Sequence, residues 1–209
     1  MKTLLFQGDS ITDCGRESCG GAGYPPGLWG PGYPGLIASY LMGSQPGKWN
    51  IVNKGISGHR IVDLYARWKQ DAINIKPDIL SILIGVNDTL HEKLYNNGVE
   101  LSRFDRFYRM LLDWSRKDNP QLKFVLMEPF VLPFGVVGED WLDDIRARQE
   151  AVRNIASDYQ AVFVPLQRIF DAALRSAPQE YWMVEGVHPQ PAGQWLIADA
   201  WLKAAMPLL

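Results

Sequence analysis

Short apolar runs alternate along the chain with longer stretches in which apolar residues recur every three or four positions. The short runs are rich in branched side chains, as expected for strands that are buried on both faces of a sheet. They cover Leu4–Phe6, Ile51–Asn53, Ile79–Ile84, Phe124–Met127 and Val162–Val164. The sequence therefore predicts five short, buried strands.

The longer stretches have the period of amphipathic helices. In the first of them, Ile61, Leu64 and Trp68 share one face. The predicted helices cover Ile61–Ile75, Phe104–Trp114, Trp141–Tyr159 and about Ala192–Ala205. Because strands and helices alternate, we predict an α/β fold with three α/β/α layers and a doubly wound parallel sheet, in the flavodoxin-like strand order 2-1-3-4-5. Neither a repeat nor a linker divides the chain, so we expect one domain over residues 1–209.

One segment interrupts this rhythm, from Cys14 to Gly35. It is dense in glycine and proline and is therefore predicted to be a loop. Loops of this length in a compact domain are usually functional or mobile. A plain insertion is the alternative, but Tyr24, Trp29 and Tyr33 make the segment a candidate for stacking on a substrate.

Polar residues and glycines follow the predicted strands, where ligands bind in open α/β sheets. A further loop, "EGVHP", precedes the last helix. In the order 2-1-3-4-5 the first three strands are neighbours, so the residues behind them should meet at one edge. The residues behind the first four strands are Ser10, then Gly55 and Gly58, then Asn87, and then Glu128.

This set has a chemical logic for ester hydrolysis. A serine hydroxyl becomes a nucleophile when a base takes its proton, and histidine is the usual base at neutral pH. Attack on an ester creates an oxyanion that needs preorganised N–H donors. A glycine lets a backbone N–H approach closely, and an asparagine supplies an uncharged donor.

The stretches "GDSITDCGR", "NKGISGHRIVDLYARW", "IGVND" and "HP" resemble, in order, the four conserved blocks of the SGNH, or GDSL-type, hydrolases. The resemblance runs from Gly8 to Pro189. The first two blocks are most similar in style to those of acetyl xylan esterases and carbohydrate acetyl esterases. This implies a serine esterase that removes acetyl groups from xylo-oligosaccharides, with no metal or cofactor.

Carried over by position, the resemblance implies that Ser10 is the nucleophile and His188 is the base. The backbone N–H groups of Ser10 and Gly58 and the amide of Asn87 would form the oxyanion hole. Each residue also has a plainer interpretation. Ser10 would serve as a helix N-cap, Asn87 as a turn residue and Gly58 as a turn former.

The orienting acid departs from the family pattern, since the residue three before the histidine is usually aspartate and here is Glu185. A carboxylate of either length can hold an imidazole. Glu128, behind the fourth strand, is a rival, and a Ser–His dyad without an essential acid is a third possibility. Of the other histidines, His59 is expected to contact substrate at the rim of the site, and His91 to lie on a loop after the asparagine block.

Composition narrows the partners. Twenty-one basic and 23 acidic residues leave a net charge of −2, so nothing favours nucleic acid or a membrane surface. The apolar run at the start, Leu4 to Phe6, is too short for a signal peptide, and we expect a cytoplasmic protein with Cys14 and Cys19 as free thiols. Exposed members of the eight tryptophans would permit a homo-oligomer.

Four functions compete at this point. The first is the short-chain esterase acting on acetylated carbohydrates. The second is a lysophospholipase or thioesterase of the same fold with a channel for long acyl chains. The third is an inactive hydrolase that binds acetylated sugars. The fourth is a nucleotide-binding flavodoxin-like protein, which the absence of a GxGxxG or GxxxxGK[ST] pattern disfavours.

Overall fold

Five parallel strands form one sheet in the order β2-β1-β3-β4-β5, which confirms the predicted topology. The structure is a computed structural model that describes residues 1–16 and 29–209. The strands are β1 (Lys2–Gly8), β2 (Trp49–Asn53), β3 (Ile79–Leu83), β4 (Lys123–Met127) and β5 (Val162–Val164). Each predicted strand is present, and β5 matches its predicted bounds.

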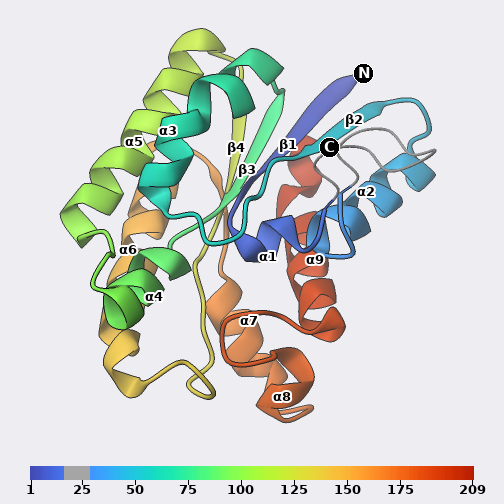
Figure 1. Cartoon of the computed structure of the whole chain (residues 1–209). Helices are drawn as coiled ribbons and strands as arrows, with labels where there is room; N and C mark the ends of the chain where they lie inside the picture. Colours follow the sequence, from blue (N-terminus) through green and yellow to red (C-terminus); the bar gives the residue numbers. More distant parts are fainter. Residues whose placement is uncertain (17–28) are drawn as a thin grey trace.

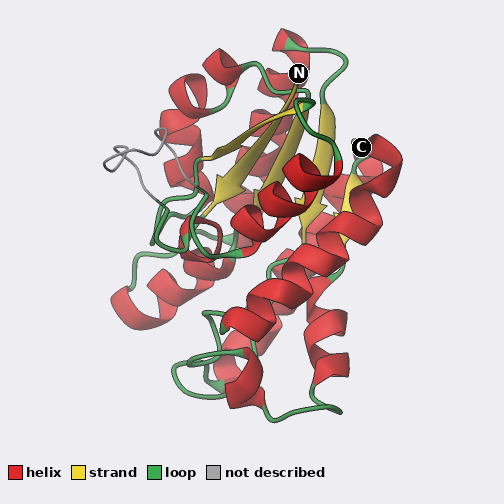
Figure 2. Cartoon of the chain, turned by 90° about the vertical axis from the view of Figure 1, so that its right-hand side faces the viewer, coloured by secondary structure: helices red, strands yellow, loops and turns green. Residues whose placement is uncertain are grey.

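Helices cover both faces of this sheet and complete the three-layer α/β/α fold (Figure 1). One layer holds α3, α5 and α6, and the other holds α2, α7 and α9. In Figure 2, α2 and α9 lie on the side of the sheet that faces the viewer. Within the described residues the helices are α1 (Ser10–Asp13), α2 (Tyr33–Ser44), α3 (Ile61–Asp71), α4 (Val86–Tyr95), α5 (Leu101–Asp118), α6 (Leu142–Asp158), α7 (Leu166–Ala173), α8 (Gln179–Trp182) and α9 (Pro191–Ala205), with 3₁₀ turns at Ile73–Ile75, Glu139–Trp141 and Met206–Leu208.

The core consists of two apolar clusters, one on each face of the sheet. Alternate side chains of β1 serve both, since Leu4 and Phe6 join the cluster under α2 and α9 while Leu5 joins the other. Each such residue, fully buried, contributes about 1.5–3 kcal/mol to folding. The one polar side chain within β3, Ser81, accepts a hydrogen bond from Nε1 of Trp201 at 2.9 Å, so its burial is compensated.

Two expectations about local structure are wrong. The loop predicted up to Gly35 gives way to α2 at Tyr33, because Pro34 lies in the first turn of the helix, where proline needs no N–H partner. His91 lies in α4 and not on a loop. Residues 17–28 of the predicted loop, which include Cys19 and Tyr24, lie outside the described residues.

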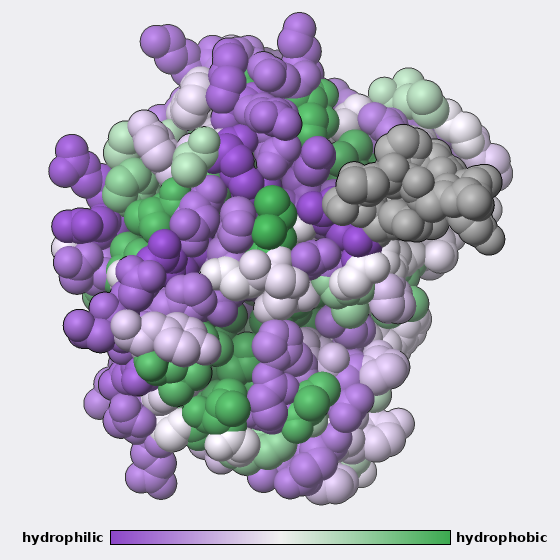
Figure 3. Space-filling view, viewed as in Figure 1, coloured by the Kyte–Doolittle hydropathy of each residue, from purple (hydrophilic) through white to green (hydrophobic). Residues whose placement is uncertain are grey.

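Polar and hydrophobic side chains are unevenly distributed over the surface. On the face shown in Figure 3, hydrophobic side chains reach the surface mainly in the lower half, beyond the carboxyl ends of the strands. No helix in residues 1–16 and 29–209 combines the length and the apolar character that crossing a bilayer requires.

Candidate active site

Ser10 stands where β1 turns into the short helix α1. The N-cap of that helix is Asp9, whose Oδ1 accepts a hydrogen bond from the N–H of Ile11 at 3.0 Å. Capping therefore does not occupy the Ser10 side chain. Its Oγ lies 2.9 Å from Nε2 of His188, although 178 positions separate the two residues in the chain.

His188 lies at the end of a tight loop between α8 and α9. Met183 and Pro189 form an antiparallel bridge across it, and the N–H of Val184 donates to the carbonyl of His188 at 2.8 Å. Met183 and Val187 point into the core and are fully buried. Anchored at these points, the loop presents the imidazole with 45% of its side chain exposed.

Glu185 contacts the other side of the same ring. Its Oε1 meets Nδ1 of His188, which places the three side chains in one continuous line of contacts. Its backbone is fixed by the segment after β4, because the N–H of Val136 donates to the Glu185 carbonyl at 3.1 Å. The following residue, Gly186, has φ +93°, and a Cβ there would stand 2.5 Å from the Leu132 carbonyl oxygen, so only glycine fits.

Glu128, the rival acid, is engaged elsewhere. Its side chain is 2% exposed, Oε1 accepts from Arg153 of α6 at 3.0 Å, and Oε2 accepts from the N–H of Gln167 of α7 at 3.0 Å. Burial raises the pKa of this carboxyl, against the lowering effect of these partners. The geometry thus joins Glu185, and not Glu128, to the histidine.

The expected oxyanion donors follow two further strands, Gly58 after β2 and Asn87 after β3. Asn87, the second residue of α4, is buried, and its Nδ2 donates to the His59 carbonyl at 3.1 Å. One amide hydrogen is used there, and the other makes no hydrogen bond within residues 1–16 and 29–209. Gly58, which precedes His59, has φ +79°, and no described atom lies within 4 Å of where a Cβ would stand. The positive φ of this turn favours glycine.

Two contacts hold the Gly58 turn against the start of the site. The N–H of Ile56 donates to the Gly8 carbonyl at 3.1 Å. Oδ2 of Asp13 accepts from both the N–H and the hydroxyl of Ser57, at 3.0 and 2.9 Å. Asp9 and Asp13 thus shape the turns around Ser10 through hydrogen bonds.

A pair of buried carboxyls underlies the site. Burial raises the pKa of Asp9 to about 7, and the nearby Asp88 carboxylate adds to this. Burial likewise raises the pKa of Asp88 to about 7, while Arg148 opposes it. Asp88 accepts from the N–H of Ile61 at 3.2 Å and so supports the start of α3. Among residues 1–16 and 29–209, no group of three His, Cys, Asp or Glu side chains is placed to hold a metal ion.

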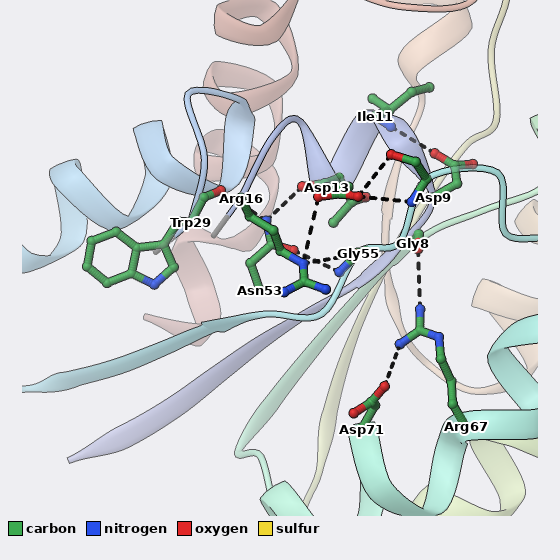
Figure 4. Close-up of polar contacts among 12 residues, drawn as sticks. Gly8, Asp9, Ile11, Asp13, Arg16, Trp29, Asn53, Gly55, Arg67 and Asp71 are labelled. Carbon is green, nitrogen blue, oxygen red and sulfur yellow. Dashed lines mark hydrogen bonds and ion pairs between the residues drawn. The ribbon is translucent and has the colours of Figure 1, made fainter. Parts of the chain in front are cut away.

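The predicted sugar-stacking residues have different outcomes. The prediction that Tyr33 stacks on a substrate is wrong, because its ring is fully buried against Phe6. Its hydroxyl forms a hydrogen bond with Thr12 Oγ1 at 2.9 Å. Trp29 is partly buried, donates from Nε1 to the Ile51 carbonyl at 2.7 Å, and lines an open cleft of about 360 Å³. Figure 4 shows its ring beside β2. Tyr24 lies outside the described residues.

Sequence reasoning missed two arginines that brace this region. Arg16 donates from Nε to the Gly55 carbonyl at 2.6 Å, and Arg67 contacts Gly8 and Asp71 (Figure 4). Arg67 also contacts His59. The available signal was the Arg67–Asp71 pair, whose i,i+4 spacing places an ion pair on one side of the predicted helix.

The known proteins that this chain resembles are GDSL-like acylhydrolases and acetylxylan esterases. Residues 6–196 match the model of the GDSL-like lipase/acylhydrolase family. An acetylxylan esterase from Geobacillus stearothermophilus is 34% identical over 209 residues, covering 96% of this chain and 92% of the relative. A GDSL-like lipase candidate from Parabacteroides merdae superposes with a TM-score of 0.90 at 36% identity, over 98% and 95% of the two chains.

The structure of Axe2, an acetylxylan esterase from G. stearothermophilus, superposes with a TM-score of 0.84 at 32% identity, over 97% of this chain and 93% of Axe2. Two further Axe2 structures are of catalytic mutants, one with a serine and one with an aspartate replaced by alanine.

Proposed function

We propose that this chain, which belongs to the GDSL-like lipase/acylhydrolase family, removes short acyl groups, above all acetyl, from xylo-oligosaccharides or related carbohydrates. That it is a carboxylic ester hydrolase follows from the family and from its acetylxylan esterase relatives. The acyl group, the carbohydrate and the roles of the residues are the proposal. The observation that carries it is the line of contacts from Ser10 through His188 to Glu185.

In the first step Ser10 Oγ attacks the ester carbonyl carbon. His188 Nε2, 2.9 Å away, takes the hydroxyl proton, so a C–O bond forms as the imidazolium appears. Glu185 holds the proton on Nδ1 and stabilises the cation. In one catalytic mutant of Axe2 an aspartate is replaced by alanine. In this chain Glu185 would take the role of the orienting acid, with a side chain that is one methylene longer than aspartate.

The tetrahedral intermediate carries its charge on the former carbonyl oxygen. The N–H groups of Ser10 and Gly58 and the free amide hydrogen of Asn87 would donate to it. Each such donor contributes about 10²- to 10³-fold in rate. The intermediate then collapses, the bond to the sugar oxygen breaks, and His188 returns its proton to that oxygen. Acetyl-Ser10 remains.

Deacylation repeats the sequence with water. His188 takes a proton from the water, the hydroxide adds to the acyl carbon, and the same donors bind the oxyanion. Collapse breaks the bond to Oγ, and His188 returns the proton to Ser10. The products are acetate and the deacetylated sugar, and every atom is accounted for without a cofactor.

A carbohydrate leaving group is supported by two features. Relatives of this chain are named acetylxylan esterase and acetyl-xylooligosaccharide esterase. Trp29 lines an open cleft beside the turn that follows Ser10, where an indole would stack on a sugar ring. His59, one residue after Gly58, would add a hydrogen bond to the substrate, and Tyr24 stays a prediction.

The decisive experiment compares acetylated xylo-oligosaccharides with p-nitrophenyl esters of rising chain length, using Ser10→Ala as the control. We expect release of acetate from the oligosaccharides, a steep fall in kcat/KM beyond acetyl, and no turnover by Ser10→Ala. A rise toward long chains would instead identify a lysophospholipase or thioesterase. Binding of acetylated sugar without hydrolysis would identify an inactive sugar-binding protein.

A further inference from the structure

Arg67, on the inner side of α3, reaches three partners, two of which, Gly8 and His59, adjoin residues of the proposed oxyanion hole. Its Nε donates to Nδ1 of His59 at 3.1 Å, and its terminal nitrogens meet the Gly8 carbonyl at 3.4 Å and Asp71 Oδ2 at 3.1 Å. Figure 4 shows the guanidinium aimed at Gly8 with Asp71 beside it. The side chain is 13% exposed, so these contacts are largely shielded from water.

The contact with His59 decides which ring nitrogen carries the proton. A guanidinium has donors and no acceptor, so Nδ1 of His59 must offer its lone pair. The ring is then neutral, with its hydrogen on Nε2. A second proton, on Nδ1, would break this hydrogen bond and place a positive imidazolium beside the positive guanidinium of Arg67. Repulsion between the two charges disfavours that state.

The surrounding charges agree with this assignment. Burial lowers the pKa of His59 most, and Arg67 lowers it further, with a smaller contribution from Arg60 in the same direction. Asp63 and Asp71 act in the opposite direction and do not offset the lowering. His59 is thus held neutral, and its bond to Arg67 persists as the pH falls toward the ordinary range of histidine titration.

His59 also touches the oxyanion hole through its main chain. Its carbonyl accepts from Asn87 Nδ2, and Gly58 is the residue before it. The Gly8 carbonyl, two residues before Ser10, binds both Arg67 and the N–H of Ile56 in the same turn. One guanidinium therefore connects the strand end that carries Ser10 with the turn that carries Gly58.

We propose that Arg67 is a positioning residue of the oxyanion hole, which fixes the Gly58–His59 turn through Nδ1 of His59 and, through the His59 carbonyl, the amide of Asn87. The inference rests on the proposed function, in which Gly58 and Asn87 bind the oxyanion. Arg67 itself does not touch the substrate.

Kinetics of Arg67→Met test this, with Lys69→Met, an exposed site on the same helix, as the matched control. We expect kcat to fall about 10- to 100-fold with KM within about threefold, because displaced donors bind the transition state less well than the bound substrate does. The control should retain its kcat. Arg67→Lys is the second variant, for use if Arg67→Met does not fold. It keeps a cation beside Asp71 but loses the planar guanidinium, so its kcat should also fall.

A double-variant comparison identifies the route. If Arg67 acts through the imidazole, His59→Ala with Arg67→Met should lower kcat no more than the larger single loss. Additive losses, or an unchanged kcat in both Arg67 variants, would overturn the inference.

Long-range ¹H–¹⁵N spectra of the His59 ring give a readout that needs no turnover, and they can be recorded on Ser10→Ala. We expect the Nε2–H tautomer in the parent chain, and a higher His59 pKa with a mixed tautomer in Arg67→Lys or Arg67→Met. A hydrogen on Nδ1 in the parent chain would overturn the inference. Full activity of Ser10→Ala would instead sink the proposed function and leave the tautomer result standing.

Discussion

The Glu185 carboxylate contacts Nδ1 of His188 from three positions earlier in the same loop, so one short segment carries both the acid and the base. The loop cannot drift freely, because the Glu185 carbonyl accepts from Val136 and the Gly186 carbonyl accepts from Leu132. Oε2 of Glu185 is buried without a hydrogen-bond partner among the described residues, which leaves the imidazole as the polar contact of this carboxylate there. Glutamate thus reaches from a fixed backbone to the ring.

Replacing Glu185 by alanine should therefore lower kcat by about 10²- to 10⁴-fold, because the imidazole loses the group that sets its tautomer and stabilises its cation. Glu128→Ala is the matched comparison. It removes the partner of Arg153 and of the Gln167 N–H, so it should cost about 1–3 kcal/mol of stability and leave kcat near that of the parent. Steady-state kinetics and thermal unfolding of both variants check this, and the reverse ranking of kcat would make Glu128 the acid.

Glu185→Asp introduces the aspartate that is usual in the family, but it should lower kcat. The carboxylate would withdraw by one methylene while hydrogen bonds to Val136 and Leu132 hold the loop in place. A misplacement of this size lowers kcat by about 10- to 100-fold. Glu180→Asp, at an exposed site in α8, serves as the control. Parent-like kcat in Glu185→Asp would mean that the loop adjusts to the shorter side chain.

The histidines separate by function. His188→Ala should reduce kcat by about 10⁴-fold or more, since Ser10 loses its base. His91→Ala should stay within about threefold, because the His91 ring packs edge-on against Tyr95 in α4 and is not in the line of contacts with Ser10. Measured kcat values decide this, and substantial turnover by His188→Ala would show that another group serves as the base.

The buried Asp9 predicts a pH-dependent stability. Its folded pKa of about 7 lies above the unfolded value of about 3.9, so between these values the folded chain keeps a proton that the unfolded chain releases. The contribution of Asp9 to the free energy of unfolding therefore falls as pH rises from about 4 to about 7, by on the order of a few kcal/mol. Asp9→Asn removes this loss and should raise Tm at pH 8 more than at pH 5.

The exposed Asp118→Asn, on α5, is the control for that measurement and should give the same Tm difference at both pH values. An Asp9→Asn effect that is equal at pH 5 and pH 8 would show that Asp9 is ionised in the folded protein throughout this range.

Tyr33→Phe should lower stability by about 1 kcal/mol and leave KM for acetylated oligosaccharides unchanged, because it removes only the buried bond to Thr12. Tyr40→Phe, exposed on the same helix, should change neither quantity. Chemical denaturation and saturation kinetics provide the two readouts. A raised KM with unaltered stability in Tyr33→Phe would return this residue to the substrate site.

The local pattern predicted much of the fold and the chemistry but not every helix. Branched apolar runs located all five strands, and the residues behind them included Ser10 and Asn87. The sequence pattern did not predict α2, because Pro34 and Gly35 are typical of loops. The buried face of this helix nevertheless packs on β1 and α9. Burial of that face outweighs the weak intrinsic propensity of its first turn.

By itself the sequence determined the α/β architecture, since the short apolar runs of buried strands and the 3.6-residue period of helices are carried by neighbouring residues. It also marked Ser10 and His188 as the pair to examine. Only the tertiary structure decided that Glu185 is in contact with His188 while Glu128 bonds Arg153, that Tyr33 is buried, and that Arg67 holds His59. These contacts and this burial depend on side-chain orientation and on how the loops and layers pack in three dimensions, and they leave no period in the sequence.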